Sequence, residues 1–269
     1  MEEKSNKMEH KSFRIFSFAI LLVILSFIII YNVWSILYSE FYGKLVLKLI
    51  PSFCIMSIPI FYYLYYRITL YTLFIHIILF FCLLGDLFLG LYDPNVAELA
   101  LFKNIYVILG GGSFLLARGL ILLAMILYPA SRLKLIKYSS ISLIISHVLF
   151  NIPFIGLSFI FYFNNNNITI TIFVMIYIIL GFGFQSSYAF LRIKAIEWES
   201  YFSSVFAFVG IMLFNVSDFI LLATMFTPMF PSYCILIADN IYWVSMFLLT
   251  ISIVRSPYTL EEKGKTLLQ

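Results

Sequence analysis

The sequence predicts an all-α, polytopic membrane protein: a bundle of eight transmembrane helices with both termini in the cytoplasm. Of its 269 residues, 63% are hydrophobic and only 11% are charged. Soluble domains contain about 25% charged and about 45–50% apolar residues. A mean hydropathy of +1.03 is too high for one globular core of this length, so lipid is the expected solvent for most side chains.

Eight apolar stretches are long enough to cross a bilayer, which takes about 20 residues of α-helix. They are expected at 15–34, 45–66, 70–91, 102–127, 138–162, 168–191, 201–226 and 234–254. The strands of a membrane barrel alternate between apolar and polar residues over about 10 positions. These stretches are longer and uniformly apolar, so helices are predicted.

The stretches divide the chain into a charged N-terminal tail over 1–14, a transmembrane domain over 15–254 and a charged C-terminal tail over 255–269. A signal peptide has an apolar core of about 7–15 residues followed by a small-residue cleavage site. The run over 15–34 is longer and has no such site, so it is expected to be the first membrane helix.

The distribution of basic residues predicts the orientation. Of the 17 Lys and Arg residues, 13 fall on the side of the predicted bundle that holds both tails, and three fall on the other side. Basic residues concentrate on the cytoplasmic side of membrane proteins. Because the basic residues lie in short loops and tails, they do not form an extended surface for nucleic acid, and no nucleic-acid partner is expected.

Two acidic residues interrupt stretches that are otherwise apolar, Asp86 in the third and Asp218 in the seventh. A charged residue at the centre of a membrane helix costs at least about 2.5–3.5 kcal/mol, so a functional role is the default interpretation. Each acid follows a charged residue, Arg67 or Glu199, by 19 positions. At about 1.5 Å per residue both carboxylates are expected roughly 28 Å from the cytoplasmic end, near the outer edge of the hydrocarbon core.

Two carboxyl groups at one depth allow one to be protonated while the other is ionised, which is the arrangement that general acid and base catalysis requires. The alternatives are that each acid hydrogen-bonds to a neighbouring helix, or that the pair relays protons during transport.

Other polar residues give weaker signals. Lys48 lies at the outer interface and either holds a phosphate group or anchors its helix. Tyr242 either contacts a substrate or belongs to the aromatic belt. Arg118 lies deep in its helix and requires an acidic partner or a polar cavity, and Asn215 precedes Asp218 by one turn and either joins the site or bridges two helices.

No metal or other cofactor is expected. His76 and His147 are the only histidines in the predicted spans, and they lack the local spacing of zinc ligands. The three cysteines lie in apolar runs without Cys-x-x-Cys spacing and are expected to be free thiols.

Several short motifs follow one another in an order that resembles the lysoplasmalogenase (YhhN-like) membrane family. The resemblance covers about residues 40–254. It rests on the eight spans and on Lys48-x-x-Pro51, Gly85-Asp86-x-x-Leu89, Gly110-x-x-x-Phe114, Leu213-Phe214-x-x-Ser217-Asp218 and Tyr242-Trp243. The sequence departs from the family pattern at three positions, where Arg118, Ile121 and Met246 stand in place of His, Tyr and Gln.

The resemblance implies a hydrolase domain over 15–254 that cleaves the vinyl ether bond of lysoplasmalogens, releasing a fatty aldehyde and a glycerophosphocholine or glycerophosphoethanolamine. It implies Asp86 and Asp218 as catalytic residues and a lysophospholipid as substrate. Lys48, Tyr242, Asn215 and Arg118 are candidates for substrate binding. For a eukaryotic member, the endoplasmic reticulum or another intracellular membrane is implied, while the oligomeric state is left open.

Two other functions are compatible with the same residues. A proton-coupled transporter would use the two acids as a relay, although the sequence lacks the inverted repeats and broken helices typical of carriers. A lipid-binding protein without catalytic activity is the other, and it is favoured by the departures at Arg118 and Met246.

Overall fold

The computed structural model describes residues 2–38, 41–65, 68, 70–91, 105–127, 145, 148, 172, 175–177, 179, 185–187, 189, 198–226, 231 and 233–255. Over these residues the chain is helical and contains no strand. It divides into two compact units, Met1–Phe114 and Leu115–Gln269, with the division inside one helix. Each unit is described by itself.

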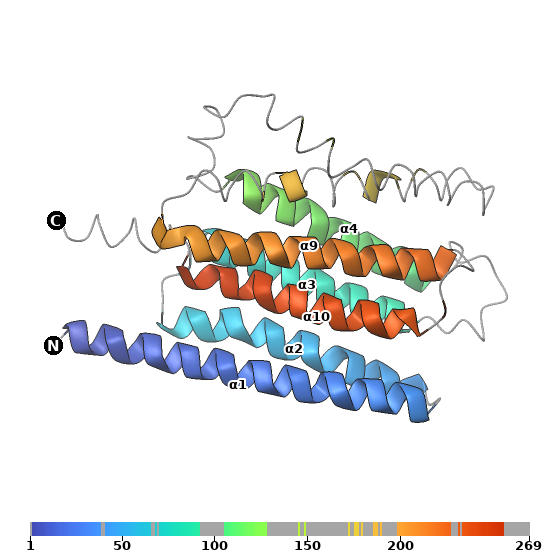
Figure 1. The fold of residues 1–269 in the computed structure, drawn as a ribbon, viewed down its shortest axis with the longest axis horizontal. Coiled ribbons are helices and arrows are strands. Elements are labelled where there is room, and N and C mark those ends of the chain that lie inside the picture. The colour runs from blue at the N-terminus through green and yellow to red at the C-terminus, as the bar shows by residue number, and fades with distance from the viewer. Residues whose placement is uncertain are drawn as a thin grey trace. The chain divides into compact units, whose positions relative to one another are not determined.

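The first unit contains α1 (Glu2–Leu37), α2 (Phe41–Tyr65), α3 (Leu70–Gly90) and the first part of α4 (Ile105–Leu127). Short connections make α1, α2 and α3 successive antiparallel neighbours, and α2 packs against both α1 and α3 (Figure 1). The rings of Phe16 on α1 and Phe61 on α2 stack with their centroids 3.8 Å apart.

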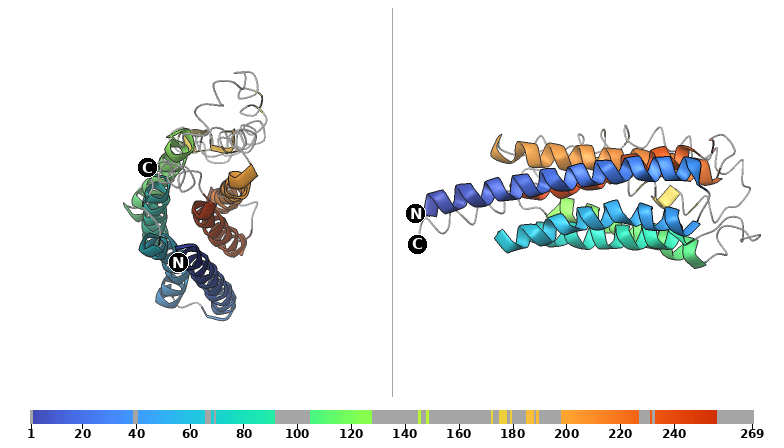
Figure 2. Two further views of the ribbon diagram at one scale, coloured as in Figure 1. Left: turned by 90° about the vertical axis from the view of Figure 1, so that its left-hand side faces the viewer. Right: turned by 90° about the horizontal axis from the view of Figure 1, so that it is seen from below.

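The second unit contains the rest of α4, then α9 (Trp198–Phe226), α10 (Cys234–Ile251) and the 3₁₀ turn η3 (Ser252–Arg255). The helices α9 and α10 run antiparallel in close contact, as two further views show (Figure 2). The hydroxyl of Ser217 on α9 donates a hydrogen bond of 2.8 Å to the carbonyl of Ala238 on α10, which fixes the two helices at this level.

Within the described residues, six helices are long and apolar enough to cross a membrane: Ile15–Leu37, Tyr42–Leu64, Leu70–Gly90, Ile105–Met125, Phe202–Thr224 and Cys234–Ile251. They confirm six of the expected spans to within a few residues. The protein is a multi-pass integral membrane protein, and the part of the chain that the structure describes is helical. The other two expected spans, 138–162 and 168–191, lie largely outside the described residues, as do His147 and most of the tail over 255–269. The expected N-terminal tail is helical from Glu2 and continuous with the first span.

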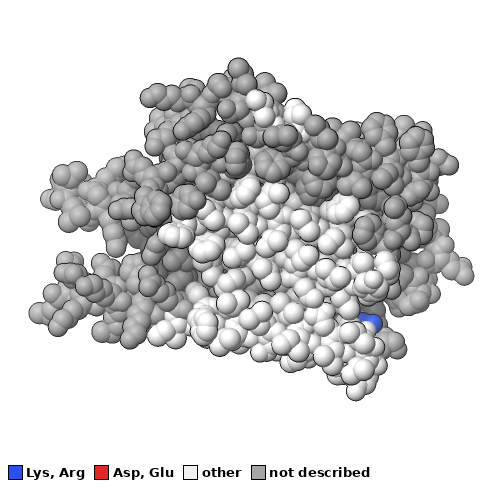
Figure 3. Space-filling view, in the orientation of Figure 1, with Lys and Arg blue, Asp and Glu red and all other residues white. Residues whose placement is uncertain are grey.

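Buried residues form a stripe along each helix at the helical period. On α3 the stripe consists of Tyr71, Thr72, Ile75, Ile78, Leu79, Cys82, Leu83, Gly85 and Asp86. Large apolar side chains occupy the other faces, including Ile36 and Leu64, each 74% exposed. On the face drawn in Figure 3, the described surface is uncharged apart from Lys or Arg at one edge. This is the surface expected for a protein embedded in lipid.

Gly210 allows the close approach of α9 and α10. A methyl group at this position would lie 3.0 Å from the Leu249 nitrogen and 3.0 Å from the Ser245 oxygen, both backbone atoms of α10. Because a helix backbone cannot rotate away as a side chain can, we expect Gly210→Ala to lower the free energy of unfolding by about 1–3 kcal/mol. SDS-induced unfolding in mixed micelles measures this loss.

Gly119 on α4 provides the matched control, since a methyl group there would meet no atom of the described chain within 4 Å. Gly119→Ala should leave the stability of the protein unchanged or raise it slightly. Equal losses in the two variants would contradict the close-approach explanation.

Candidate functional site

Asp218 lies on the buried face of α9, together with Ile211, Phe214 and Asn215 at helical spacing. It is 5% exposed. Glu199 and Asp218 belong to the same uninterrupted helix, so the 19-residue spacing used to estimate the depth of this carboxylate is helical throughout. The carboxylate thus faces protein and not lipid, as intramembrane acids usually do.

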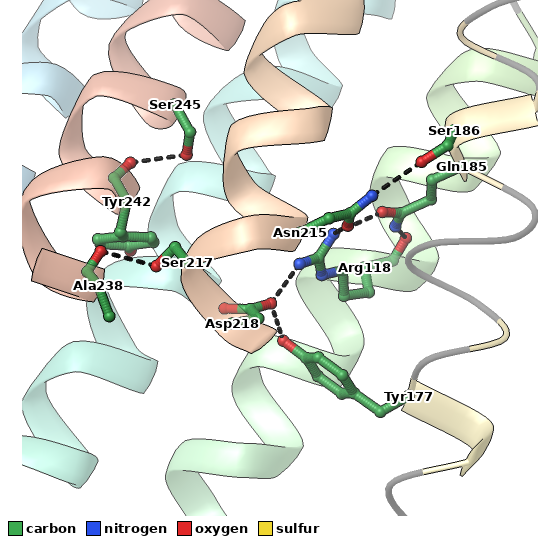
Figure 4. A network of polar contacts seen from close by, with 10 residues as sticks. All are labelled: Arg118, Tyr177, Gln185, Ser186, Asn215, Ser217, Asp218, Ala238, Tyr242 and Ser245. Carbon is green, nitrogen blue, oxygen red and sulfur yellow. Dashed lines mark hydrogen bonds and ion pairs between the residues drawn. The ribbon is translucent and has the colours of Figure 1, made fainter. Parts of the chain in front are cut away.

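Two groups donate hydrogen bonds to one oxygen of this carboxylate, Oδ2. They are Nη2 of Arg118, which also forms an ion pair with Asp218, and the hydroxyl of Tyr177 (Figure 4). No hydrogen bond from the described residues reaches the other oxygen, Oδ1, which points away from both donors in Figure 4. The described residues therefore hold the carboxylate from one side.

Arg118 is completely buried and its head group is fixed by several contacts. Its Nη1 donates to Oδ1 of Asn215 and, at 2.8 Å, to Oε1 of Gln185. The Gln185 amide in turn donates from Nε2 to the backbone carbonyl of Arg118, so this one side chain holds both ends of the arginine. Arg118 Nε has no hydrogen-bond partner within the described part of the chain.

Aromatic rings complete the surroundings of the guanidinium group. The centre of the Phe214 ring is 3.8 Å from Arg118 Cζ, and that of the Tyr177 ring is 5.5 Å away. Cation–π contacts of this kind contribute up to about 2 kcal/mol when desolvated. Asn215 extends the contacts further, since its Nδ2 donates a 2.8 Å hydrogen bond to the hydroxyl of Ser186.

These six residues, Arg118, Tyr177, Gln185, Ser186, Asn215 and Asp218, are called the Arg118 cluster below. They come from α4, from the stretch 177–186 and from α9, and all lie within the second unit. A buried ion pair is tolerated only when further hydrogen bonds satisfy its polar atoms. The cluster supplies such further bonds to Nη1, from Asn215 and Gln185, and to Oδ2, from Tyr177. Arg118 was expected to have an acidic partner or a polar cavity, and the structure gives it an acidic partner, Asp218.

Asp86 lies in the first unit, on the buried face of α3, and is 3% exposed. The hydroxyl of Ser52 on α2 donates a 2.7 Å hydrogen bond to its Oδ2. The neighbouring Gly85 leaves room for the ring of Phe114, since a methyl group at Gly85 would lie 2.6 Å from that ring. The motif residues around Asp86 therefore join α3 to α4 and set the position of the acid.

Gly110, from the motif that resembles the start of the fourth family helix, has a similar packing role. A methyl group on Gly110 would lie 2.7 Å from Leu89, the last residue of the motif around Asp86. Gly110 therefore allows α4 to approach α3 closely at Leu89.

Among the other candidate residues, Lys48 is half-buried on α2. Tyr242 is 4% exposed and its ring lies 5.6 Å from that of Phe214, so it packs in the core between α9 and α10. Met246, where the family pattern has Gln, is 2% exposed on α10. The expected roles of Lys48, Tyr242, Asn215 and Arg118 in substrate binding stay predictions.

Four contributors were not found from the sequence: Ser52, Tyr177, Gln185 and Ser186. The run Gln185-Ser186-Ser187 is a polar interruption of an apolar stretch and was a usable signal. Tyr177 and Ser52 gave no signal, because the chain contains 19 tyrosines and isolated serines are common in membrane helices.

Within the described part of the chain, no three His, Cys, Asp or Glu side chains gather in a way that could hold a metal ion. All three cysteines are free, as expected. His76 stacks on the ring of Tyr63, with centroids 5.6 Å apart.

No protein-family model, curated protein or solved structure matches this chain. The likeness to the lysoplasmalogenase family thus rests on the sequence motifs and stays a prediction.

Proposed function

We propose that this protein is an intramembrane hydrolase of the lysoplasmalogenase type, which cleaves the vinyl ether bond of a lysoplasmalogen by general acid and base catalysis. The observation that supports it most is the buried carboxylate of Asp218, paired with Arg118 and contacted by described residues through one oxygen only. The proposal retains eight membrane spans, both termini in the cytoplasm, and the endoplasmic reticulum or another intracellular membrane as its location.

The reaction needs one acid and one base. A protonated carboxyl transfers a proton to the alkene carbon that is remote from the ether oxygen, which produces an oxocarbenium ion. Water adds to this cation and gives its proton to the ionised carboxylate, forming a hemiacetal. The first carboxylate then removes the hemiacetal hydroxyl proton while the second carboxyl protonates the leaving oxygen, so aldehyde and alcohol separate and both groups are restored. Glycosidases divide the work between two carboxyl groups in a related way.

The ion pair supports giving the ionised role to Asp218, because Arg118 compensates its negative charge. Asp86 then takes the acid role by elimination within this scheme. Both residues are expected at one depth from their spacing in the sequence, just beneath the head-group region where a lysolipid carries its vinyl ether. Lys48, expected at the same rim, is proposed to hold the phosphate.

The test compares three lysolipids that differ only at the first glycerol carbon: a 1-alkenyl, a 1-alkyl and a 1-acyl ethanolamine lipid. Purified protein in detergent should release aldehyde from the alkenyl lipid, with neither an alkanol from the alkyl lipid nor a fatty acid from the acyl lipid. If no aldehyde appears under conditions in which the protein is folded, the hydrolase assignment is wrong.

A lipid-binding protein without turnover is the second candidate, and it is favoured by the extent to which Arg118 is already engaged by Asp218, Asn215 and Gln185. Saturable binding of the same alkenyl lipid without aldehyde release would select it. Uptake into liposomes driven by a pH gradient, and lost in both Asp86→Asn and Asp218→Asn, would instead select a transporter.

A further inference from the structure

The Arg118 cluster holds Asp218 asymmetrically, and this asymmetry distinguishes the two carboxylate oxygens. Arg118 and Tyr177 both donate to Oδ2, and within the described chain nothing donates to Oδ1. An acceptor already engaged by two donors, one of them charged, has less electron density available for a third partner. Oδ1 is therefore the oxygen that can accept a proton from water.

We infer that Tyr177 is a positioning residue, which together with Arg118 anchors Oδ2 and presents Oδ1 to the attacking water. This inference rests on the proposed function, since it names the working oxygen of the proposed base. Tyr177 itself touches neither water nor substrate in this scheme and acts only through Asp218.

The position of the Tyr177 side chain fits this role. The residue is 6% exposed, and its ring lies 5.5 Å from the guanidinium carbon of the arginine that shares its acceptor. Ring and hydroxyl therefore constrain the two members of the ion pair at once. Rotation of the carboxylate about its Cβ–Cγ bond would exchange Oδ1 and Oδ2, and the two donors on one oxygen oppose that rotation.

Tyr177→Phe removes the hydroxyl and keeps the ring, so it tests the inference with little change in packing. We expect kcat for aldehyde release to fall about tenfold while KM changes less than twofold, because substrate contacts are untouched and one hydrogen bond to a charged group is lost. Tyr63→Phe is the matched control, because the Tyr63 hydroxyl donates a 3.0 Å hydrogen bond to a backbone carbonyl, that of Thr72 in the first unit. It should leave kcat unchanged.

A second measurement does not depend on activity. Infrared bands of the Asp218 carboxylate, isolated as the difference between the wild-type protein and Asp218→Asn, should show a wide separation of symmetric and antisymmetric stretches, as an unequally bonded carboxylate does. The separation should narrow in Tyr177→Phe. Site-specific 3-fluorotyrosine at position 177 is a stronger hydrogen-bond donor of nearly the same shape and should widen the separation. This variant provides the test if Tyr177→Phe does not fold.

The outcomes separate the inference from the function on which it rests. If Asp218→Asn is inactive but Tyr177→Phe keeps wild-type kcat, the positioning role is wrong and the hydrolase stands. If the wild-type protein releases no aldehyde, or Asp218→Asn remains fully active, the proposed catalysis fails. Infrared bands that do not respond to either change at position 177 would then also reject the anchoring of Oδ2.

Discussion

Arg118→Met is expected to lower the free energy of unfolding by about 3–5 kcal/mol, the usual cost of removing one partner from a buried ion pair. The substitution leaves the 5% exposed carboxylate of Asp218 without its cation. It also removes the guanidinium donor to the side-chain oxygens of Gln185 and Asn215, and the cation over the Phe214 ring. SDS-induced unfolding in mixed micelles measures the loss.

The double variant Arg118→Met with Asp218→Leu shows whether the cost comes from the unpaired charge. Replacing a whole buried ion pair by apolar residues of similar size is often neutral. The double variant should therefore be more stable than Arg118→Met alone, which requires a favourable coupling between the two changes. Strictly additive losses would contradict the energetic role of the pair. Lys44→Met, which removes a half-buried cation near the start of α2, is the control and should have a much smaller effect.

Asp218→Asn and Asp86→Asn are each expected to lower kcat for aldehyde release by about 10²–10⁴, the usual contribution of a general acid or base. The amide is nearly isosteric with the carboxyl group but neither releases a proton nor accepts one from water. Because the two carboxyl groups act in one proton cycle in the proposed mechanism, the double variant should lose little more than either single variant.

Asp239→Asn is the matched control for this comparison. Asp239 is also a buried acid, 4% exposed on α10, and it has no part in the proposed reaction. It should keep kcat within a few-fold of wild type. Wild-type rates in both Asp86→Asn and Asp218→Asn would reject the carboxylate mechanism.

The membrane spans were predictable because hydropathy over about 20 residues is a local property of the chain. The six described spans begin and end within a few residues of the expected positions. Helix ends were less predictable, as α1 shows by beginning at Glu2, where the charged tail continues the helix without a breaker. Pro51 and Pro59 both lie inside α2, so proline did not mark the ends of this helix.

The candidate site was predictable only in part. Asp86, Asp218 and Arg118 stood out because a charge in an apolar stretch is conspicuous whatever the fold. Their partners did not, because pairing depends on which helices pack together. Arg118 is separated by 67 residues from Gln185 and by 100 from Asp218, and no local period carries information over such distances. Tyr177 is the clearest case. It donates a hydrogen bond directly to Asp218, but nothing in the sequence around it distinguishes it from the other tyrosines.

The separation of Arg118 from Asp218 has a consequence for how the protein is made. Asp218 is synthesised 100 residues after Arg118. At a synthesis rate of about 5–20 residues per second, Asp218 leaves the ribosomal exit tunnel roughly 5–20 s after Arg118. During that interval α4 contains a cation that is costly to expose to lipid. Stable insertion of α4 should therefore depend on the later arrival of α9. Among chains truncated before Asp218, those with Arg118 should be degraded by quality control faster than those with Arg118→Met.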